Sequence, residues 1–228
     1  MQRTFGFGAV EDAAWVNARL KAWFGVVPSI QFRAPIDQLV KSSISGRTRD
    51  EVSRAAHLRL LDAFPAWADA ACARVADIEA VIGDVTFPDV KARRLRQTLR
   101  TIAAQCPDFD LTFLSRFGVA EALAWLERLP GVGRKVSAST LNFSTLRMPA
   151  FVVDTHVLRV LQRFGFVRTG ADTPSAYDRM MESLDGWSAA ELAEFHVRMK
   201  GLGQAVCRAD HAGCRRCVLN KGCRGAAI

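Results

Sequence analysis

The segment Leu129-Pro130-Gly131-Val132-Gly133-Arg134-Lys135 decides how this chain folds, because it separates two helical patterns. Before it, residues 119–129 place apolar side chains at helical spacing, and after it residues 136–143 form a helical pattern of small residues. Pro130 ends the first helix, and the two glycines allow a sharp turn whose N–H groups remain exposed. The sequence therefore predicts a helix–hairpin–helix.

Exposed N–H groups at the start of a helix favour a phosphate, through their unpaired donors and the helix dipole. The hairpin residues Gly131, Val132, Gly133 and Arg134 are thus expected to hold one point on a nucleic-acid backbone without reading bases. Taken alone, the hairpin is equally well interpreted as a plain turn. Two further residues favour the phosphate-binding interpretation: Lys135, directly after the hairpin, and Asp154, which opens the next helical pattern.

The overall charge of the chain indicates an anionic partner. The 228 residues carry a formal net charge of +8 and a sequence pI near 9.6, which favours binding to a polyanion. Basic residues gather in two places, an expected helix with Lys91, Arg93, Arg94, Arg96 and Arg100, and a C-terminal segment with Arg208, Arg215, Arg216, Lys221 and Arg224. Either cluster alone is also consistent with a solvated surface.

Helical spacing recurs along the whole chain, and no alternating strand pattern is found, which predicts an all-α fold of roughly ten helices. No apolar run approaches the roughly 20 residues of a membrane span, and the first residues lack a signal-peptide layout. We therefore expect an intracellular protein without disulfides.

The four C-terminal cysteines give the clearest chemical signal. Their spacing is C-x6-C-x2-C-x5-C, formed by Cys207, Cys214, Cys217 and Cys223. Thiolates that converge from one short segment need a soft metal centre, and the spacing alone leaves zinc plausible beside an iron–sulfur group. The spacing of bacterial ferredoxins does not match. Of the remaining cysteines, Cys72 is expected to be a core thiol and Cys106 a loop residue.

The hairpin LPGVGRK, the segment VDTH at 153–156 and the cysteine spacing together resemble the endonuclease III family of DNA glycosylases, in the helix–hairpin–helix superfamily with an iron–sulfur loop. The resemblance implies two helical lobes with DNA crossing the cleft between them. Residues 33–147 would form a six-helix barrel that contains the hairpin. Residues 1–32 and 148–228 would form the second lobe, whose four cysteines hold a [4Fe–4S] cluster.

The resemblance also implies roles for two residues. Lys135 matches the family's nucleophile, which attacks C1′ of a flipped-out nucleotide, forms a Schiff base and permits β-elimination. Asp154 matches the catalytic carboxylate. Their simpler roles are a phosphate contact for Lys135 and a helix N-cap for Asp154, and capping is compatible with catalysis.

The implied function is a base-excision-repair DNA glycosylase with AP lyase activity. Its partner would be double-stranded DNA with a damaged base, typically an oxidised pyrimidine, or with an abasic site. We expect a cytoplasmic monomer associated with the nucleoid through DNA. Two alternatives remain: a monofunctional glycosylase for adenine or mismatched thymine, against which Lys135 argues, and a non-catalytic module that binds DNA structures.

Two departures from the family pattern concern the lesion. Arg47 stands where the family usually has a glutamine that fills the space left by the flipped nucleotide. Arginine can fill that space and donate hydrogen bonds to the orphaned base, or it can contact a phosphate. Phe87 lies in the second altered loop, as a wedge between bases or as a buried anchor. With both elements changed, the preference for oxidised pyrimidines is in doubt.

Overall fold

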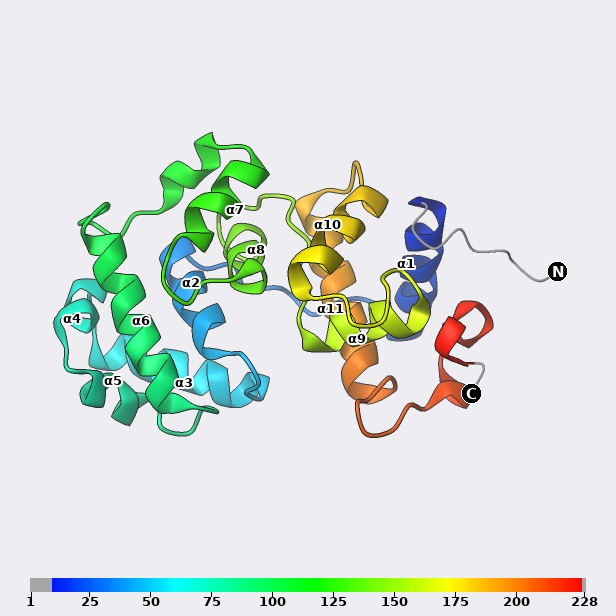
Figure 1. Cartoon of the computed structure of the whole chain (residues 1–228), viewed down its shortest axis with the longest axis horizontal. Helices are drawn as coiled ribbons and strands as arrows, with labels where there is room; N and C mark the ends of the chain where they lie inside the picture. The colour runs from blue at the N-terminus through cyan, green and yellow to red at the C-terminus, as the bar shows by residue number, and fades with distance from the viewer. Residues whose placement is uncertain (1–9, 227–228) are drawn as a thin grey trace. The chain divides into compact units, whose positions relative to one another are not determined.

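The computed structural model describes residues 10–226. This part of the chain contains eleven α-helices, four short 3-10 helices and no strand, which confirms the expected all-α class (Figure 1). Extended backbone pairs here only as two isolated bridges, Arg33 with Ser144 and Cys207 with Ala212. None of the described helices is both long and apolar enough to cross a bilayer.

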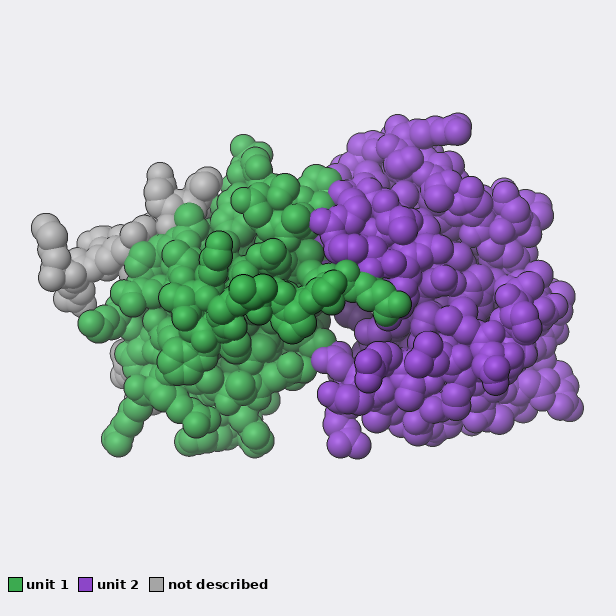
Figure 2. Space-filling model, turned by 180° about the vertical axis from the view of Figure 1, so that it is seen from behind, with its two compact units in different colours: residues 1–31, 149–228 green, residues 32–148 purple. Residues whose placement is uncertain are grey.

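The chain divides into two compact units, coloured separately in Figure 2. Unit 2 is the continuous segment Phe32–Met148, and unit 1 combines the chain up to Gln31 with the chain from Pro149 onward. Unit 2 contains the 3-10 helix η1 (Thr112–Arg116) and the helices α2 (Pro35–Ile44), α3 (Asp50–Ala63), α4 (Trp67–Cys72), α5 (Val75–Val81), α6 (Pro88–Ala103), α7 (Val119–Glu127) and α8 (Arg134–Asn142).

Helix α6 organises unit 2. Proline at its first position fits a helix start, and its buried stripe recurs at helical spacing, with Ala92, Leu95, Leu99 and Ile102. Helices α4 and α5 pack against α6, while α2 and α7 pack against α8. Burial of these apolar stripes stabilises the helices far more than their intrinsic propensity does.

Unit 1 is built around a pair of packed helices, α9 and α11. Its described elements are α1 (Val10–Phe24), α9 (Thr155–Phe164), α10 (Thr173–Ser183), α11 (Ala189–Ala205), and the 3-10 helices η2 (Cys214–Arg216), η3 (Asn220–Gly222) and η4 (Arg224–Ala226). The fully buried rings of Phe151 and Phe195 stack with their centroids 5.4 Å apart. This core supports the extended segment that leads into α9.

One expectation about the core was wrong. Cys72 is exposed and does not form a core thiol. It is the last residue of the six-residue helix α4, whose inward positions are taken by Trp67, Ala70 and Ala71. The next position along the helix is rotated by about 100°, which turns the Cys72 side chain away from the core.

Candidate nucleic-acid interface

The predicted helix–hairpin–helix is formed by α7, the turn at residues 128–133 and α8. Leu129 and Val132 are buried and anchor the turn, whereas both glycines are exposed. Gly131 has a φ of 78°, in the left-handed region, and Gly133 has a φ of −112°. Within residues 10–226 the N–H groups of these glycines donate to no acceptor. The turn therefore presents two unpaired donors beside the start of α8.

Helix α6 packs against the hairpin and contacts it through two side chains. The Thr98 hydroxyl donates to the carbonyl oxygen of Pro130 at 2.6 Å. The aliphatic part of the Arg94 side chain lies under Gly131, so closely that a Cβ there would meet it at 3.1–3.3 Å. The hairpin is thus held in one position with its glycines facing outward.

Arg134 is engaged within unit 2. Its Nε donates to Glu127 Oε1 at 2.6 Å, and the Ser137 hydroxyl donates to the same oxygen at 2.7 Å. The arrangement ties the end of α7 to the first turn of α8. A contact between the Arg134 side chain and DNA stays a prediction, and it would compete with this ion pair.

The two glycines allow a test that separates folding from binding. Gly131→Ala is expected to destabilise the protein by about 1–2 kcal/mol, because alanine disfavours a positive φ and its Cβ would press on Arg94. Gly133→Ala has open space around its Cβ, so it should unfold at nearly the wild-type urea concentration. Its Cβ would instead obstruct a phosphate approaching the backbone and weaken duplex binding. Wild-type affinity of Gly133→Ala, measured by fluorescence anisotropy, would count against phosphate binding at the hairpin.

Lys135 lies at the second position of α8 and is half-buried. Its Nζ donates to Ser45 Oγ at 2.7 Å and to the carbonyl oxygen of Ser42 at 3.3 Å. Both acceptors belong to the C-terminal end of α2, where helix carbonyls favour a cation. The amine is therefore held by α2, and only its neutral form could act as a nucleophile.

Asp154, in unit 1, caps α9, which confirms the expected N-cap. Its Oδ1 accepts from the N–H groups of His156 and Val157 at 2.9 and 2.8 Å. Burial by itself raises the pKa of Asp154, but the positive charge of His196, the Val157 N–H and the charge of Lys200 outweigh burial and lower the pKa below the ordinary range. The group is an ionised carboxylate at neutral pH. Both capping bonds fall on Oδ1, so Oδ2 makes no hydrogen bond within the described chain.

Arg47 and Phe87 lie on two loops of unit 2, the Arg47 loop (residues 45–49) and the Phe87 loop (residues 82–87). Both residues have left-handed backbones, with φ of 55° and 58°. Phe87 is 53% exposed, which excludes a buried anchor, and Arg47 is exposed as well. A cavity of about 290 Å³ is lined by both residues, by Lys91 and Arg94 of α6, and by Gly131. Arg47 and Phe87, the two departures from the family pattern, thus line the same cavity as the hairpin residue Gly131. No carboxylate lines this cavity.

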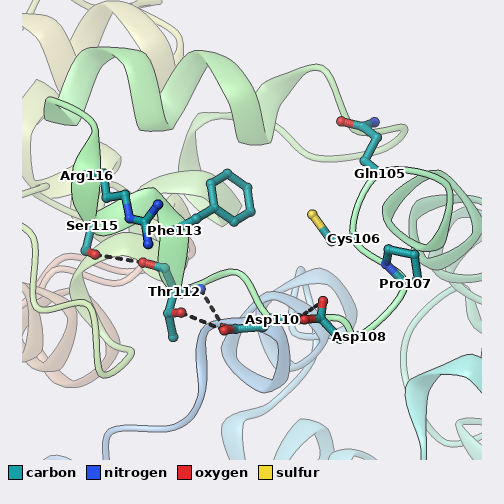
Figure 3. A pocket seen from close by; sticks show the side chains of 9 residues that line it. All are labelled: Gln105, Cys106, Pro107, Asp108, Asp110, Thr112, Phe113, Ser115 and Arg116. Carbon is teal, nitrogen blue, oxygen red and sulfur yellow. Dashed lines mark hydrogen bonds between the residues drawn. The ribbon is translucent and has the colours of Figure 1, made fainter.

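A larger hollow of unit 2, about 650 Å³, is a poorer candidate (Figure 3). Its two carboxylates are occupied by local turns: Asp108 accepts from the Asp110 N–H at 3.1 Å, and Asp110 accepts from the N–H and hydroxyl of Thr112 at 2.8 Å each. Burial raises the pKa of the Cys106 thiol, and Asp108 and Asp110 raise it further. The hollow therefore offers no reactive thiolate, and local turns engage both of its carboxylates.

The four predicted cysteine ligands line one small cavity in unit 1, together with residues that include Arg163 and Asn220. Arg163 Nη1 lies 3.4 Å from Cys207 Sγ, and the carbonyl oxygen of Arg163 accepts from Cys223 Sγ at 3.3 Å. Burial raises the pKa of Cys223 to about 11, with the other three cysteines contributing. Within residues 10–226 no group of three or more His, Cys, Asp or Glu side chains is placed to hold a metal ion.

Sequence reasoning missed the residues that connect these elements. Thr48 accepts hydrogen bonds from both Thr86 and Lys91, which lie 38 and 43 positions away, and no local pattern indicates that. The sequence also predicts that the basic residues of α6 form one cluster. In the structure Lys91 and Arg94 line the cavity beside the hairpin, whereas the other three arginines of α6 line a separate groove.

Comparison with known protein families gives a match over most of the chain. The family model described as HhH-GPD superfamily base excision DNA repair protein matches residues 40–187. Endonuclease III of Thermotoga maritima is 29% identical over 194 residues, which covers 83% of this chain and 82% of that protein. Endonuclease III of a Synechocystis species is 28% identical over 206 residues, covering 90% and 88%.

Solved structures show a similar fold. A trapped endonuclease III–DNA covalent intermediate has a TM-score of 0.79 and 22% sequence identity, covering 96% of this chain and 97% of that chain. A thermostable thymine-DNA glycosylase has a TM-score of 0.75 and 15% identity, covering 95% and 97%. At these identities the likeness supports the fold, and it does not choose between the two activities.

Proposed function

Because this chain belongs to the HhH-GPD superfamily of base excision DNA repair proteins, as an endonuclease III-family DNA glycosylase, we propose that it is bifunctional and combines base removal with AP lyase activity. In this proposal Lys135 is the nucleophile and Asp154 the catalytic carboxylate. The observation that carries it is the position of Lys135 two residues after Gly133, in the first turn of the helix that follows a hairpin whose glycine N–H groups are unpaired. A phosphate bound there would bring the adjacent sugar toward the amine.

In the proposed reaction, bonds form and break on the deoxyribose of a single nucleotide. The neutral Lys135 amine attacks C1′, and the N-glycosidic bond breaks with its electron pair leaving on the base, which takes up a proton. The nitrogen gives up a proton and O4′ takes one up as the C1′–O4′ bond opens, which leaves the iminium form of the Schiff base. Loss of a proton from C2′ expels the 3′ phosphate and cuts the strand. Before attack the amine must leave its hydrogen bonds to Ser45 and Ser42.

Asp154 suits a role as an ionised group. Its pKa lies below the ordinary range, so it carries a negative charge at neutral pH and can stabilise positive charge that develops on the sugar. Its unbonded Oδ2 is the oxygen available for that contact or for accepting a proton. The capping bonds hold the carboxylate in one orientation, as electrostatic catalysis requires.

The proposed substrate is double-stranded DNA with a damaged base, in the first instance an oxidised pyrimidine, or with an abasic site. The charge of +8 and the carboxylate-free cavity beside the hairpin support an anionic partner. We propose that the protein works as a monomer on nucleoid DNA in the cytoplasm. Residues 33–147 would be the helical lobe that carries the hairpin, and the remaining residues would be the cluster lobe.

The four cysteines suit a [4Fe–4S] cluster better than a single zinc ion. Zinc requires its ligands to converge on one point, whereas a cluster distributes four thiolates over several iron atoms. All four thiols line one common cavity, and membership of the endonuclease III family favours a cluster there. When bound, such a group would supply a cross-link for a loop too short to have a core of its own. Cys207, Cys214, Cys217 and Cys223 would hold it.

A cysteine substitution tests the cluster. The purified protein is expected to be brown with broad visible absorption, and Cys217→Ser should lose most of the colour and the bound iron. Cys72→Ser is the matched control, because Cys72 is exposed and lies outside the cavity. Iron and sulfide analysis measures the content directly. A colourless protein that binds stoichiometric zinc would overturn the assignment.

The bifunctional proposal is tested by borohydride trapping. Purified protein incubated with an abasic duplex and borohydride should form a covalent protein–DNA adduct, because borohydride reduces the Schiff base. Duplexes with one modified base each, scored for cleavage with and without alkali, then identify the lesion. Base release that always requires alkali for strand cleavage, with no adduct, would indicate a monofunctional glycosylase.

A further inference from the structure

The Arg47 loop and the Phe87 loop are cross-linked by hydrogen bonds. The Thr86 hydroxyl donates to the carbonyl oxygen of Arg47 at 2.8 Å, and the Thr86 N–H donates to Thr48 Oγ1 at 3.1 Å. Each loop therefore supplies a polar group that the other loop binds. The bonds reach the backbone of Arg47 itself and the residue directly before Phe87.

Lys91 completes the network from the first turn of α6. Its Nζ donates to Thr48 Oγ1 at 2.9 Å and to the carbonyl oxygens of Gly46 at 2.7 Å and Ile44 at 2.8 Å. Thr48 Oγ1 thus accepts from Thr86 and Lys91, and it donates to the Gly46 carbonyl at 3.3 Å. One hydroxyl group uses its full capacity of one donor and two acceptor sites. Burial lowers the pKa of Lys91 to about 8.

The network offsets an unfavourable backbone conformation. Arg47 and Phe87 both lie in the left-handed region, which costs a non-glycine residue roughly 1 kcal/mol or more. Strain of this kind persists where surrounding contacts over-determine it, and it is common at functional sites. Here it directs two exposed side chains, a guanidinium and a phenyl ring, outward beside one cavity.

The Arg47 guanidinium is available to a ligand. Within the described chain its side chain makes no hydrogen bond or ion pair, whereas its backbone carbonyl is bound by Thr86. A guanidinium offers only donors, so it would contact carbonyl oxygens and ring nitrogens of a base. A phenyl ring beside it supplies the stacking surface that an unstacked base needs.

Starting from the expectation that Arg47 and Phe87 contact the strand opposite a flipped nucleotide, we propose that Thr48, Thr86 and Lys91 are positioning residues that lock the two loops into one rigid unit. The inference rests on the proposed function, since it requires a duplex with a nucleotide flipped out. Two independent loops would insert their side chains one at a time. Locked loops insert both together, so that loss of either side chain removes most of the benefit of the other.

A double-mutant cycle on DNA binding tests the lock without catalysis. The probe is a duplex with a tetrahydrofuran abasic analogue opposite 2-aminopurine, and its Kd is measured for Arg47→Ala, Phe87→Ala and the double variant. When Thr48 is unchanged, the double variant should bind at least about fivefold more tightly than multiplying the losses of affinity of the two single variants predicts. When Thr48→Val is also present, the loss of affinity in the double variant should equal the product of the two single losses. Thr48→Ser should restore the coupling.

Further readouts separate positioning from folding. Thr48→Val should weaken the change in 2-aminopurine fluorescence on binding, and Thr86→Val, which removes only the hydroxyl bond to Arg47, should do so as well. Thr101→Val is the matched control, because the Thr101 hydroxyl bonds only within α6. Coupling between Arg47 and Phe87 that persists in both valine variants would overturn the proposal. So would its absence in the protein with Thr48 unchanged. Equal affinity for abasic and intact duplexes would instead count against the proposed activity on abasic DNA, and the inference would fail with it.

Discussion

Lys135→Gln is expected to abolish covalent trapping on abasic DNA and to lower strand cleavage by roughly 10⁴-fold or more, because no amine remains to form the Schiff base. The fold should survive, since the glutamine amide can donate to Ser45 Oγ and the Ser42 carbonyl as the amine does. Duplex binding should fall by less than about tenfold, the contribution of one charge near a phosphate. Borohydride trapping, single-turnover cleavage and anisotropy measure the three quantities.

The comparison variant for this experiment is Lys21→Gln. Lys21 is an exposed lysine of α1 in unit 1, so its replacement lowers the net charge equally without touching unit 2. It should trap and cleave as the wild type does. Should Lys135→Gln still trap, another amine would be the nucleophile, and the assignment to Lys135 would fail.

Asp154→Asn is expected to lower the single-turnover rate of base removal by roughly 10²–10⁴-fold. The substitution removes the negative charge but keeps an oxygen that can accept from His156 and Val157, and asparagine is as good an N-cap as aspartate. Thermal unfolding should therefore change little while the rate falls. The affinity for a duplex with an abasic analogue should not fall, because the substitution removes a negative charge that repels phosphate.

The chain offers a closely matched control in Asp172, which caps α10 and accepts from the Ser175 N–H at 2.9 Å. Asp172→Asn makes the same chemical change at a helix N-terminus without affecting Asp154, so its rate should equal that of the wild type. A wild-type rate for Asp154→Asn as well would assign Asp154 a capping role alone, because asparagine keeps the cap.

Several features followed from the sequence because each depends on residues close together in the chain. The hairpin requires proline and glycine between two helical patterns, and the structure places α7 and α8 there. Asp154 caps the helix that begins one residue later. The cysteine spacing is likewise local, and all four side chains line one cavity. Turns, caps and short spacings are set by local backbone conformation, which a sequence specifies directly.

Only the tertiary structure decided how distant segments meet. The bonds among Thr48, Thr86 and Lys91 arise because packing of α2 against α6 brings their ends together. Packing also places Arg134 against Glu127, Phe87 on the surface beside Arg47, and Cys72 outside the core. These outcomes depend on how buried stripes interlock between helices, and hydrophobic periodicity indicates which face is buried but not which partner covers it.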